Sequence, residues 1–303
     1  MNAMYAVQFD FPGGRETLSY REAIEPILGT GEVMIGFEAS SINPADVKIS
    51  SGRIAPRAGT SPFTLGWDLV GIVDKVAPDV DTFRVGDRVI GMSTMASTGR
   101  GTWSQLVALP ATSLALAPAG IEPTVLAQLP LAGLTALKAV DELGPIPDQA
   151  VLVVGAAGAV GSCVVQLLAR LGVEVHALVR THAQGDALAS VGPVSAVYTG
   201  EAPASSFGAI IDAAGIDAAY ALRPGGTYVT CVPGTLPESV GANGAIGVTV
   251  IVPESGTNLA TLLGYLADGS LNLGEPSVFR LSDIATALMA FENRLGRRTV
   301  LTS

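Results

Sequence analysis

Several residue types that mark particular protein classes are scarce in this chain of 303 residues. It contains 2 cysteines, Cys163 and Cys231, which are too few for a disulfide framework, so we expect both to be small buried hydrophobic side chains. Charged residues make up 15% of the chain and hydrophobic residues 49%. This balance excludes an intrinsically disordered protein and indicates a compact globular one.

Basic residues are also few and scattered. The net charge is −10, and the largest basic cluster is the pair Arg297-Arg298, so nucleic acids and anionic membrane surfaces are not expected as partners. Apolar runs stay below the roughly 18 residues of a membrane span. The N-terminus shows no charged leader followed by an apolar run. We therefore expect a cytoplasmic protein without a membrane partner.

The segment from Val151 to Arg180 has the pattern of a dinucleotide-binding unit. Val151 to Val154 reads as a strand buried on both faces, and a turn of small residues follows it. Apolar residues then recur at helical spacing until Gly172, and Val173 to Val179 reads as a second buried strand. Strand, glycine turn, helix and strand together form the βαβ unit that binds dinucleotides.

Each glycine of the turn has a mechanical reason. Gly155 allows the sharp turn, Gly158 lets backbone approach a pyrophosphate, and Gly161 lets the helix pack close to its strand. The spacing is G-x-x-G-x-x-G rather than the commoner G-x-G-x-x-G, and the alternative is an ordinary strand-to-helix turn. Because both strands and the helix are present, we expect the cofactor to contact Gly155, Ala156, Ala157, Gly158, Ala159, Val160 and Gly161.

The residues after the second strand indicate which cofactor binds. An NAD site places an acidic residue about 20 residues after the glycines, on the ribose 2′-hydroxyl. This chain instead has Arg180, Thr181 and His182, with no carboxylate before Asp186. A guanidinium there would pair with a 2′-phosphate. We therefore predict NADPH, contacted by Arg180 and Thr181, although Arg180 could also be a solvated side chain at a strand end.

The remaining chain divides into a β-rich part, residues 1–118, an alternating part, 119–255, and a return segment, 256–303. In the first part we expect strands over Met4–Asp10, Leu18–Glu25, Glu32–Ser40 and Ser104–Leu109. Pro123–Leu143 is expected to be helical, interrupted at Pro130 and Gly133 and closed by Pro145 and Pro147. Alternation predicts a doubly wound parallel sheet. This sheet is expected to include strands over Ala209–Asp212, Gly226–Val232 and Val248–Val252. After it we expect helices over Asn258–Ala267 and Ser282–Arg294. A last strand, Arg298–Leu301, is expected to pair back into the first part.

Motifs along the chain resemble one family. They are SSINPADVK from Ser40, GWDLVGIV from Gly66, FRVGDRV from Phe83, LPLAGLTA from Leu129, AAGAVG from Ala156 and LRPGG from Leu222. In this order they resemble the zinc-independent, quinone-oxidoreductase-like branch of the medium-chain dehydrogenase/reductases. The resemblance implies a GroES-like catalytic domain formed by both chain ends, an inserted Rossmann domain, and an active site in the cleft between them. It also implies hydride transfer from NADPH to a quinone or an electron-poor C=C, and homodimers joined through the strand near Val248–Val252.

Zinc-dependent members of the family depart from this sequence at their ligand positions. They resemble it but carry a cysteine where Ile42-Asn43-Pro44 stands, a His-Glu pair where Trp67-Asp68 stands, and a four-cysteine lobe where this chain has MSTMASTGRG. Zinc requires thiolate or imidazole ligands in tetrahedral arrangement. Since 2 cysteines and 2 histidines cannot supply either site, we expect no metal.

The resemblance also gives roles to residues of the first part. Lys48, in the N-P-x-D-x-K pattern, is the candidate that stabilises the developing oxyanion or donates the proton; an exposed helical lysine is the alternative. Asn43 is expected to contact the nicotinamide ribose or the substrate. Asp46 either orients Lys48 or caps the helical turn. Trp67 and Trp103 could line the substrate pocket, or lie in the core as large aromatic residues usually do.

Further cofactor contacts are implied on the alternating part. Thr135 matches the family's hydroxyl near the carboxamide or ribose, or is simply a helical threonine. Ala213 and Ala214 are expected at the adenine side, and Val232 and Pro233 beside the nicotinamide, because ligands bind at the carboxyl ends of parallel strands.

Three functions remain open at this stage. The leading one is an NADPH-dependent quinone or enone/enal reductase acting on a small molecule. The second is an enoyl-thioester reductase, for which no basic entrance cluster is visible. The third is a non-catalytic NADPH-binding sensor or structural protein.

Overall fold

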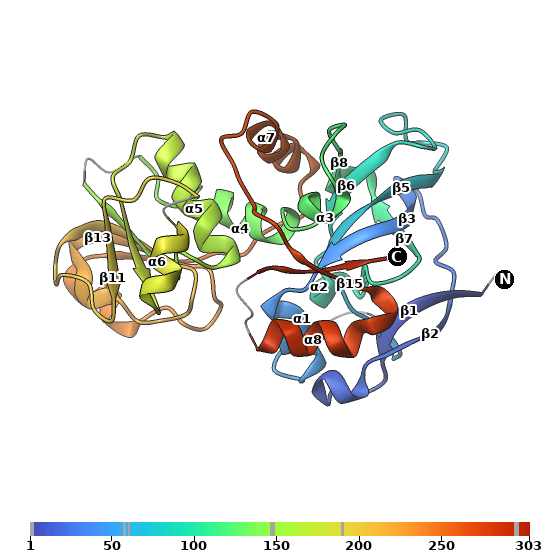
Figure 1. Cartoon of the computed structure of the whole chain (residues 1–303), viewed down its shortest axis with the longest axis horizontal. Coiled ribbons are helices and arrows are strands. Elements are labelled where there is room, and N and C mark those ends of the chain that lie inside the picture. The colour runs from blue at the N-terminus through green and yellow to red at the C-terminus, as the bar shows by residue number, and fades with distance from the viewer. Residues whose placement is uncertain (1–2, 57–58, 60, 146–148, 189–190, 294–296) are drawn as a thin grey trace. The chain divides into compact units, whose positions relative to one another are not determined.

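The computed structural model describes residues 3–56, 59, 61–145, 149–188, 191–293 and 297–303 (Figure 1). The chain forms two compact units. Unit 1 comprises Met1–Leu131, Pro253–Gly264 and Gly274–Ser303, and unit 2 comprises Ala132–Val252 and Tyr265–Leu273. Residues 119–131 therefore lie with unit 1 and residues 265–273 with unit 2. The division predicted from the sequence has 119–131 in the alternating part and 265–273 in the return segment. The functional domains as predicted, 1–118, 119–255 and 256–303, stay a prediction.

Unit 1 contains two β-sheets. The larger has the strand order β15-β16-β3-β5-β6-β8, with β7 pairing to β3, and the smaller has the order β2-β1-β4. The strands are β1 (Ala3–Phe9), β2 (Ser19–Ile24), β3 (Glu32–Ser41), β4 (Phe63–Thr64), β5 (Asp68–Val76), β6 (Arg88–Met92), β7 (Leu106–Pro110), β8 (Leu114–Leu116), β15 (Ser277–Arg280) and β16 (Thr299–Thr302). Its helices are α1 (Pro44–Ser50), α2 (Met95–Thr98), α3 (Pro123–Leu126) and α8 (Ile284–Glu292).

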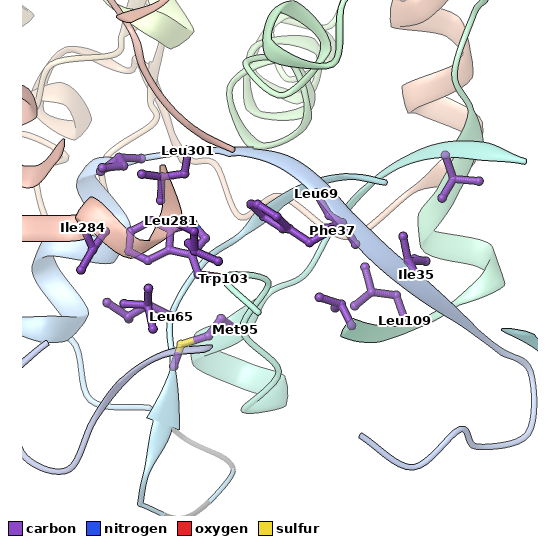
Figure 2. Packing of buried hydrophobic residues seen from close by; sticks show 14 of the residues in the cluster. Ile35, Phe37, Leu65, Leu69, Met95, Trp103, Leu109, Leu281, Ile284 and Leu301 are labelled. Atoms are coloured by element: carbon purple, nitrogen blue, oxygen red, sulfur yellow. The ribbon is translucent and has the colours of Figure 1, made fainter. Parts of the chain in front are cut away.

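The core of unit 1 joins residues from both ends of the chain. Figure 2 shows Trp103 among side chains from the N-terminal strands and from the C-terminal segment, including Leu65, Leu281 and Leu301. Leu301 is inaccessible to solvent and lies on β16, which pairs antiparallel with β3. The predicted return of the last strand into the first part of the chain is confirmed.

Unit 2 is built on a parallel sheet with the order β11-β10-β9-β12-β13-β14. The strands are β9 (Val151–Val154), β10 (Val175–Val179), β11 (Ala196–Thr199), β12 (Phe207–Asp212), β13 (Leu222–Thr230) and β14 (Ile246–Thr249). Helix α5 (Ala159–Arg170) packs on β9 and β10, and α6 (His182–Leu188) packs on β10 and β11. The order reverses direction between β9 and β12, so this is the doubly wound Rossmann arrangement.

Two helices run across the boundary between the units in the chain. They are α4 (Pro130–Asp141) and α7 (Gly256–Ala267). Pro130 begins α4 because proline is tolerated in the first helical turn. Gly133 does not interrupt it, so that part of the prediction was wrong: an isolated glycine costs about 1 kcal/mol in a helix, which the burial of this helix offsets.

The predicted fold class, a Rossmann sheet domain with a β-rich domain, is confirmed. The predicted boundaries of the βαβ unit also agree closely, since Gly172 follows α5 with a left-handed φ of +73°. Strand β11 and helix α6 were not predicted. Pro147 and Arg294, which the sequence placed at helix ends, lie outside the described residues.

Candidate active site

The glycine turn of unit 2 joins β9 to α5 where the strand order reverses. Gly155 has a φ of +73°, in the left-handed region that glycine adopts without strain. A Cβ atom on Gly155 would lie 2.8 Å from the Cβ of Ala214, so the loop after β12 also closes on this position. Such a reversal is where dinucleotides bind in doubly wound sheets.

Gly161 brings the first turn of α5 against the glycine turn. A Cβ atom on Gly161 would lie 2.3 Å from the carbonyl oxygen of Gly155 and 2.8 Å from the Cα of Ala156. Gly158 is the N-cap of α5 in extended conformation. First-turn N–H groups have no intrahelical acceptor and the helix dipole is positive there. The turn therefore has the close backbone and the donors that a pyrophosphate requires.

Two further predicted loops lie on the same edge of the sheet. Asp212, the last residue of β12, is in register with Val154 on one side and Thr230 on the other. The N–H of Ala213 donates to the carbonyl oxygen of Val154 at 3.0 Å. The structure thus brings together the glycine turn, Ala213–Ala214 and the segment that leads into Val232–Pro233.

Asp212 fixes the loop after β12. Its Oδ1 accepts hydrogen bonds from the backbone N–H groups of Ala214 at 2.9 Å, Gly215 at 2.9 Å and Ile216 at 3.3 Å. Burial raises the pKa of Asp212, and these donors oppose the shift. The side chain therefore holds the loop in the shape that meets the glycine turn. Burial also raises the pKa of the nearby Cys231 thiol to about 12, so it is not a thiolate nucleophile near neutral pH.

Arg180 follows β10 on this edge and its side chain is exposed. Its backbone N–H donates to Gln184 Oε1 at 3.1 Å, and Thr181 Oγ1 accepts from the Gln184 N–H at 3.3 Å, so both residues open α6. The Arg180 guanidinium forms no ion pair with any residue in the described part of the chain. It is available to an anion. Thr135 lies buried on α4, apart from these loops in sequence.

In unit 1, the turn from β3 into α1 is held by Asp46. Its Oδ2 accepts from the backbone N–H of Asn43, the N-cap of α1, at 2.9 Å, and its Oδ1 accepts from the Gly66 N–H at 3.2 Å. Burial raises the pKa of Asp46 well above its usual range; these donors oppose that shift and the neighbouring Asp68 adds to it. Asp46 therefore caps the turn, the second of its two predicted roles, and it forms no ion pair with Lys48 among the described residues.

Asp68 is a buried carboxylate that organises the same edge. It accepts from the Asn43 Nδ2 at 2.8 Å, from the Leu131 N–H at 2.7 Å and from the Ser41 hydroxyl. Burial raises its pKa to about 6, and the donors together with the charge of Arg298 oppose that shift. Because an ionised carboxylate only accepts hydrogen bonds, it fixes which way the Asn43 amide turns.

Lys48 lies half-buried on α1, one turn beyond its N-cap. Its carbonyl oxygen accepts from the Ile54 N–H at 3.0 Å, which folds the following loop back over the helix. Its ammonium group makes no hydrogen bond or ion pair with residues in the described ranges. The structure therefore leaves the Lys48 charge available, as a proton donor or an oxyanion stabiliser must be.

The two tryptophans have different surroundings. Trp103 is inaccessible to solvent within the core, and its Nε1–H donates to Ser40 Oγ at 3.0 Å. This position does not support the predicted pocket-lining role. Trp67 is half-buried and packs against the same core, and its buried Nε1–H has no partner among the described residues. An unpaired buried donor costs about 1–3 kcal/mol, so this group requires an explanation.

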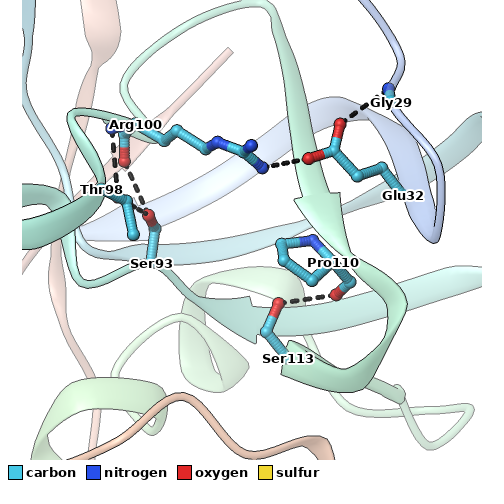
Figure 3. A network of polar contacts seen from close by, with 7 residues as sticks. All are labelled: Gly29, Glu32, Ser93, Thr98, Arg100, Pro110 and Ser113. Carbon is cyan, nitrogen blue, oxygen red and sulfur yellow. Dashed lines mark hydrogen bonds and ion pairs between the residues drawn. The ribbon is translucent and has the colours of Figure 1, made fainter. Parts of the chain in front are cut away.

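A charged cavity of about 320 Å³ lies elsewhere on unit 1, beside the segment MSTMASTGRG. Figure 3 shows Arg100 paired with Glu32, whose other oxygen accepts from the Gly29 N–H at 2.8 Å. Ser93 Oγ donates to the Arg100 carbonyl oxygen at 2.7 Å. The Arg100–Glu32 pair holds the loop after α2 against β3.

Within the described ranges, no group of three or more His, Cys, Asp or Glu side chains is arranged to hold a metal ion. In the same part of the chain, none of the helices is both long enough and apolar enough to cross a membrane.

Known proteins share this architecture and parts of this sequence. Residues 29–119 match the alcohol dehydrogenase GroES-like domain. The quinone oxidoreductase from Coxiella burnetii has the same fold, with a TM-score of 0.89 at 22% identity over 100% of both chains. A chloroplastic quinone oxidoreductase of Triphysaria versicolor is 34% identical over 179 residues, 56% of this chain and 53% of that protein. In fold and in sequence the chain is similar to the medium-chain dehydrogenase/reductases. Its similarities lie in their quinone-oxidoreductase branch.

A third similarity is to much longer proteins. A mycocerosic acid synthase-like polyketide synthase of Mycobacterium tuberculosis is 32% identical over 187 residues, which are 61% of this chain and 9% of the synthase. The chain thus matches about half the length of the curated quinone oxidoreductase and under a tenth of this synthase.

Two carboxylates of the candidate site received no role from the sequence. The sequence marks Asp68 only as part of the position where zinc-dependent relatives carry a ligand pair, and Asp212 only as the end of a strand. The signal in both cases is an acidic residue bordering a run of apolar strand residues, LVGIV after Asp68 and AII before Asp212. A carboxylate buried at such a place requires hydrogen-bond donors, and here the donors are N–H groups that belong to the turns of the candidate site.

Proposed function

We propose that this chain is an NADPH-dependent oxidoreductase that transfers a hydride to a quinone or to the β-carbon of an α,β-unsaturated carbonyl compound, without zinc. The observation that carries the proposal is the glycine turn at the N-terminus of α5, with the unpaired Arg180 guanidinium on the same sheet edge. A dinucleotide with a 2′-phosphate satisfies both features at once.

The cofactor residues of the proposal belong to unit 2. The turn from Gly155 to Gly161 binds the pyrophosphate through N–H groups, and Arg180 with Thr181 binds the 2′-phosphate. Ala213 and Ala214 leave room for the adenine side, and Val232 and Pro233 border the nicotinamide. Thr135 and Asn43 supply polar contacts to the carboxamide and ribose. When bound, NADPH supplies the hydride.

The substrate-side residues of the proposal belong to unit 1. As the hydride reaches the acceptor, negative charge builds on the carbonyl oxygen, and a cation aimed at that oxygen lowers the barrier. Lys48 is assigned this role because its ammonium group is available and the residue lies on α1, the helix that Asn43 caps. Asp46 and Asp68 act as positioning residues, since they hold the turn and the amide on which the site is built. Zinc has no part because the ligand positions of zinc-dependent relatives hold other residue types.

The similarity to quinone oxidoreductases supports a quinone as acceptor. We extend the proposal, from the family resemblance, to a homodimer joined through the strand near Val248–Val252, which in the structure is β14 (Ile246–Thr249). The cytoplasmic location stays a prediction.

A second candidate is reduction of an enoyl thioester. The similarity to segments of polyketide synthases, 32% and 35% identical in two cases, favours it. The net charge of −10 speaks against an entrance for the phosphates of coenzyme A, whereas a carrier-bound thioester makes a smaller electrostatic demand.

The deciding experiment follows NADPH oxidation with a panel of quinones, short enals and one enoyl thioester. We expect turnover with a quinone or an enal and little with the thioester. Fast turnover with the thioester alone would favour the second candidate. NADPH binding without turnover on any acceptor would indicate a sensor or structural protein.

A further inference from the structure

The segment that leads into β5 is held by a row of hydrogen bonds within unit 1. Four successive carbonyl oxygens, those of residues 65–68, accept donors from other segments. Three of the donors are backbone N–H groups, those of Trp103 at 2.8 Å, Thr102 at 3.2 Å and Ser93 at 2.7 Å. The Asp68 carbonyl oxygen accepts instead from the Thr102 side-chain hydroxyl at 2.7 Å. Every residue except proline has a backbone N–H, so only this fourth donor depends on the residue type.

Thr102 bonds to the two residues of this segment that hold the turn into α1. Its N–H donates to the carbonyl oxygen of Gly66, whose own N–H donates to Asp46 Oδ1 at 3.2 Å. Its hydroxyl donates to the carbonyl oxygen of Asp68, whose carboxylate accepts from Asn43 Nδ2 at 2.8 Å. Thr102 is therefore connected to both carboxylates of the turn, to Asp46 through Gly66 and to Asp68 directly.

Close packing surrounds the Thr102 hydroxyl. The residue is inaccessible to solvent. Gly66 has a φ of +106°, and a Cβ atom on it would collide with Thr102 Oγ1, just as one on Gly101 would collide with the Thr64 carbonyl oxygen. A buried hydrogen bond in such surroundings is stronger than in water. Without the hydroxyl, the Asp68 carbonyl oxygen would lose this donor, and the cost of that loss favours a shift of the segment.

We propose that Thr102 is a positioning residue for the hydride transfer, an inference that rests on the proposed function. Its hydroxyl fixes Asp68, which in turn orients the Asn43 amide at the start of α1. The same helix carries Lys48. Thr102 itself is buried and touches neither cofactor nor acceptor. A displacement of about 1 Å at the reacting groups can cost about 100-fold in rate, so the hydroxyl contributes to kcat as well as to the stability of unit 1.

Three variants separate positioning from stability. Thr102→Val keeps the size of the side chain and removes the hydroxyl, whereas Thr102→Ser keeps the hydroxyl and removes a buried methyl group. Ser113→Ala is the matched control, because the buried Ser113 hydroxyl also donates to a carbonyl oxygen of unit 1, that of Pro110 at 2.8 Å (Figure 3). Each change removes a buried hydrogen bond or methyl group, so all three variants should melt at a lower temperature.

Turnover should distinguish the variants. We expect Thr102→Val to lower kcat with a quinone about 10- to 100-fold and to keep the preference for NADPH over NADH, because the residues assigned to the 2′-phosphate belong to unit 2. Thr102→Ser and Ser113→Ala should keep kcat within about twofold of the unchanged protein. An unchanged kcat in Thr102→Val overturns the inference. An equal loss in Thr102→Ser or Ser113→Ala overturns it too, because destabilisation alone would then explain the effect.

A second measurement does not depend on turnover. The Asn43 side-chain amide gives a pair of signals in the spectrum of ¹⁵N-labelled protein, and Asn43→Ser identifies them. These signals should move in Thr102→Val and stay in place in Thr102→Ser and Ser113→Ala, since only the first change releases Asp68. Asn43 signals that stay in place in Thr102→Val overturn the inference alone. If the unchanged protein reduces no acceptor, the proposed function fails, and the role of Thr102 in the reaction fails with it.

Discussion

At the scale of single residues, three buried carboxylates shape the turns that carry the candidate site. Asp46 holds the entry into α1, Asp68 holds the Asn43 amide, and Asp212 holds the loop beside the glycine turn. Each is satisfied mainly by N–H donors, and burial raises the pKa of each. Since burial still raises their pKa values despite these donors, the hydrogen bonds offset only part of the cost of burying the charge, and these residues exchange some stability for fixed geometry.

The raised pKa of Asp68 predicts that the free energy of unfolding depends on pH. Its pKa is about 6 in the folded protein against an ordinary 3.8, so the folded state binds its proton more tightly than the unfolded state does. The contribution of Asp68 to stability is therefore most favourable below pH 4 and declines as the pH rises towards 6. Two pKa units correspond to on the order of 3 kcal/mol. Unfolding by urea from pH 4 to 7.5 should show the stability of the protein falling by this much relative to Asp68→Asn.

The control is Asp268, a carboxylate whose pKa is lowered in the folded protein instead of raised. A hydrogen bond from Ser270 lowers the pKa of the exposed Asp268, so relative to Asp268→Asn the protein should gain stability with rising pH. A stability difference between the protein and Asp68→Asn that is constant with pH would contradict the buried-carboxylate account.

The assignment of Arg180 predicts cofactor preference. Arg180→Gln should weaken NADPH binding about 10- to 100-fold, the range of a charge-assisted hydrogen bond, and leave NADH binding unchanged. Arg223→Gln is the matched control, because Arg223 is exposed at the amino end of β13, on the opposite edge of the sheet. Isothermal titration with both cofactors gives the comparison. Equal losses for NADPH and NADH, or none, would show that Arg180 does not read the 2′-phosphate.

At the scale of elements, the sequence predicted those strands and helices whose bounds are set by neighbouring residues. The strand Val151–Val154 has its predicted bounds and α5 ends before the predicted Gly172, because apolar periodicity and glycine are local signals. Strand β11 was missed since its residues, AVYT, are too few for a pattern and are only partly buried. The burial of Trp103 and the capping by Asp46 depend on residues far away in sequence, such as Ser40 and Gly66, which no local pattern reports.

The junction of α5 with the glycine turn predicts a difference between two helical glycines. Gly161→Ala places a Cβ 2.3 Å from a backbone oxygen, so we expect a loss of about 1–3 kcal/mol and at least tenfold weaker NADPH binding. Gly264 lies within α7 with nothing within 4 Å of its would-be Cβ. Gly264→Ala should stabilise the protein by about 0.5–1 kcal/mol and leave binding unchanged. Thermal unfolding and NADPH titration measure both effects, and tight binding by Gly161→Ala would contradict the close packing inferred here.

At the scale of the whole molecule, both chain ends contribute to one core. The GroES-like match covers residues 29–119, yet β16 and α8 complete that unit from the C-terminus. The motifs that carry the family resemblance are spread over nearly the whole chain, but they carry no information about which acceptor is reduced.

The proposed homodimer predicts the behaviour of the β14 edge. Ile246 is 60% exposed on β14 and Ile251 is 79% exposed just after it. Changing both to lysine should convert a dimer into a monomer in light scattering after size exclusion, because charge opposes edge pairing. Val85→Lys, at a residue 69% exposed on unit 1, should leave the dimer intact. A monomeric unchanged protein, or a dimer that survives the double change, would contradict the proposed interface.

The central claim is that NADPH reduces a small conjugated carbonyl compound on this protein. It is tested most directly by following NADPH oxidation and acceptor loss together, without oxygen, with a quinone as acceptor and NADH in a parallel reaction. The account predicts one NADPH consumed for each quinone reduced to hydroquinone, and a kcat/KM for NADPH at least tenfold above that for NADH. No turnover, or equal use of NADH, would contradict it.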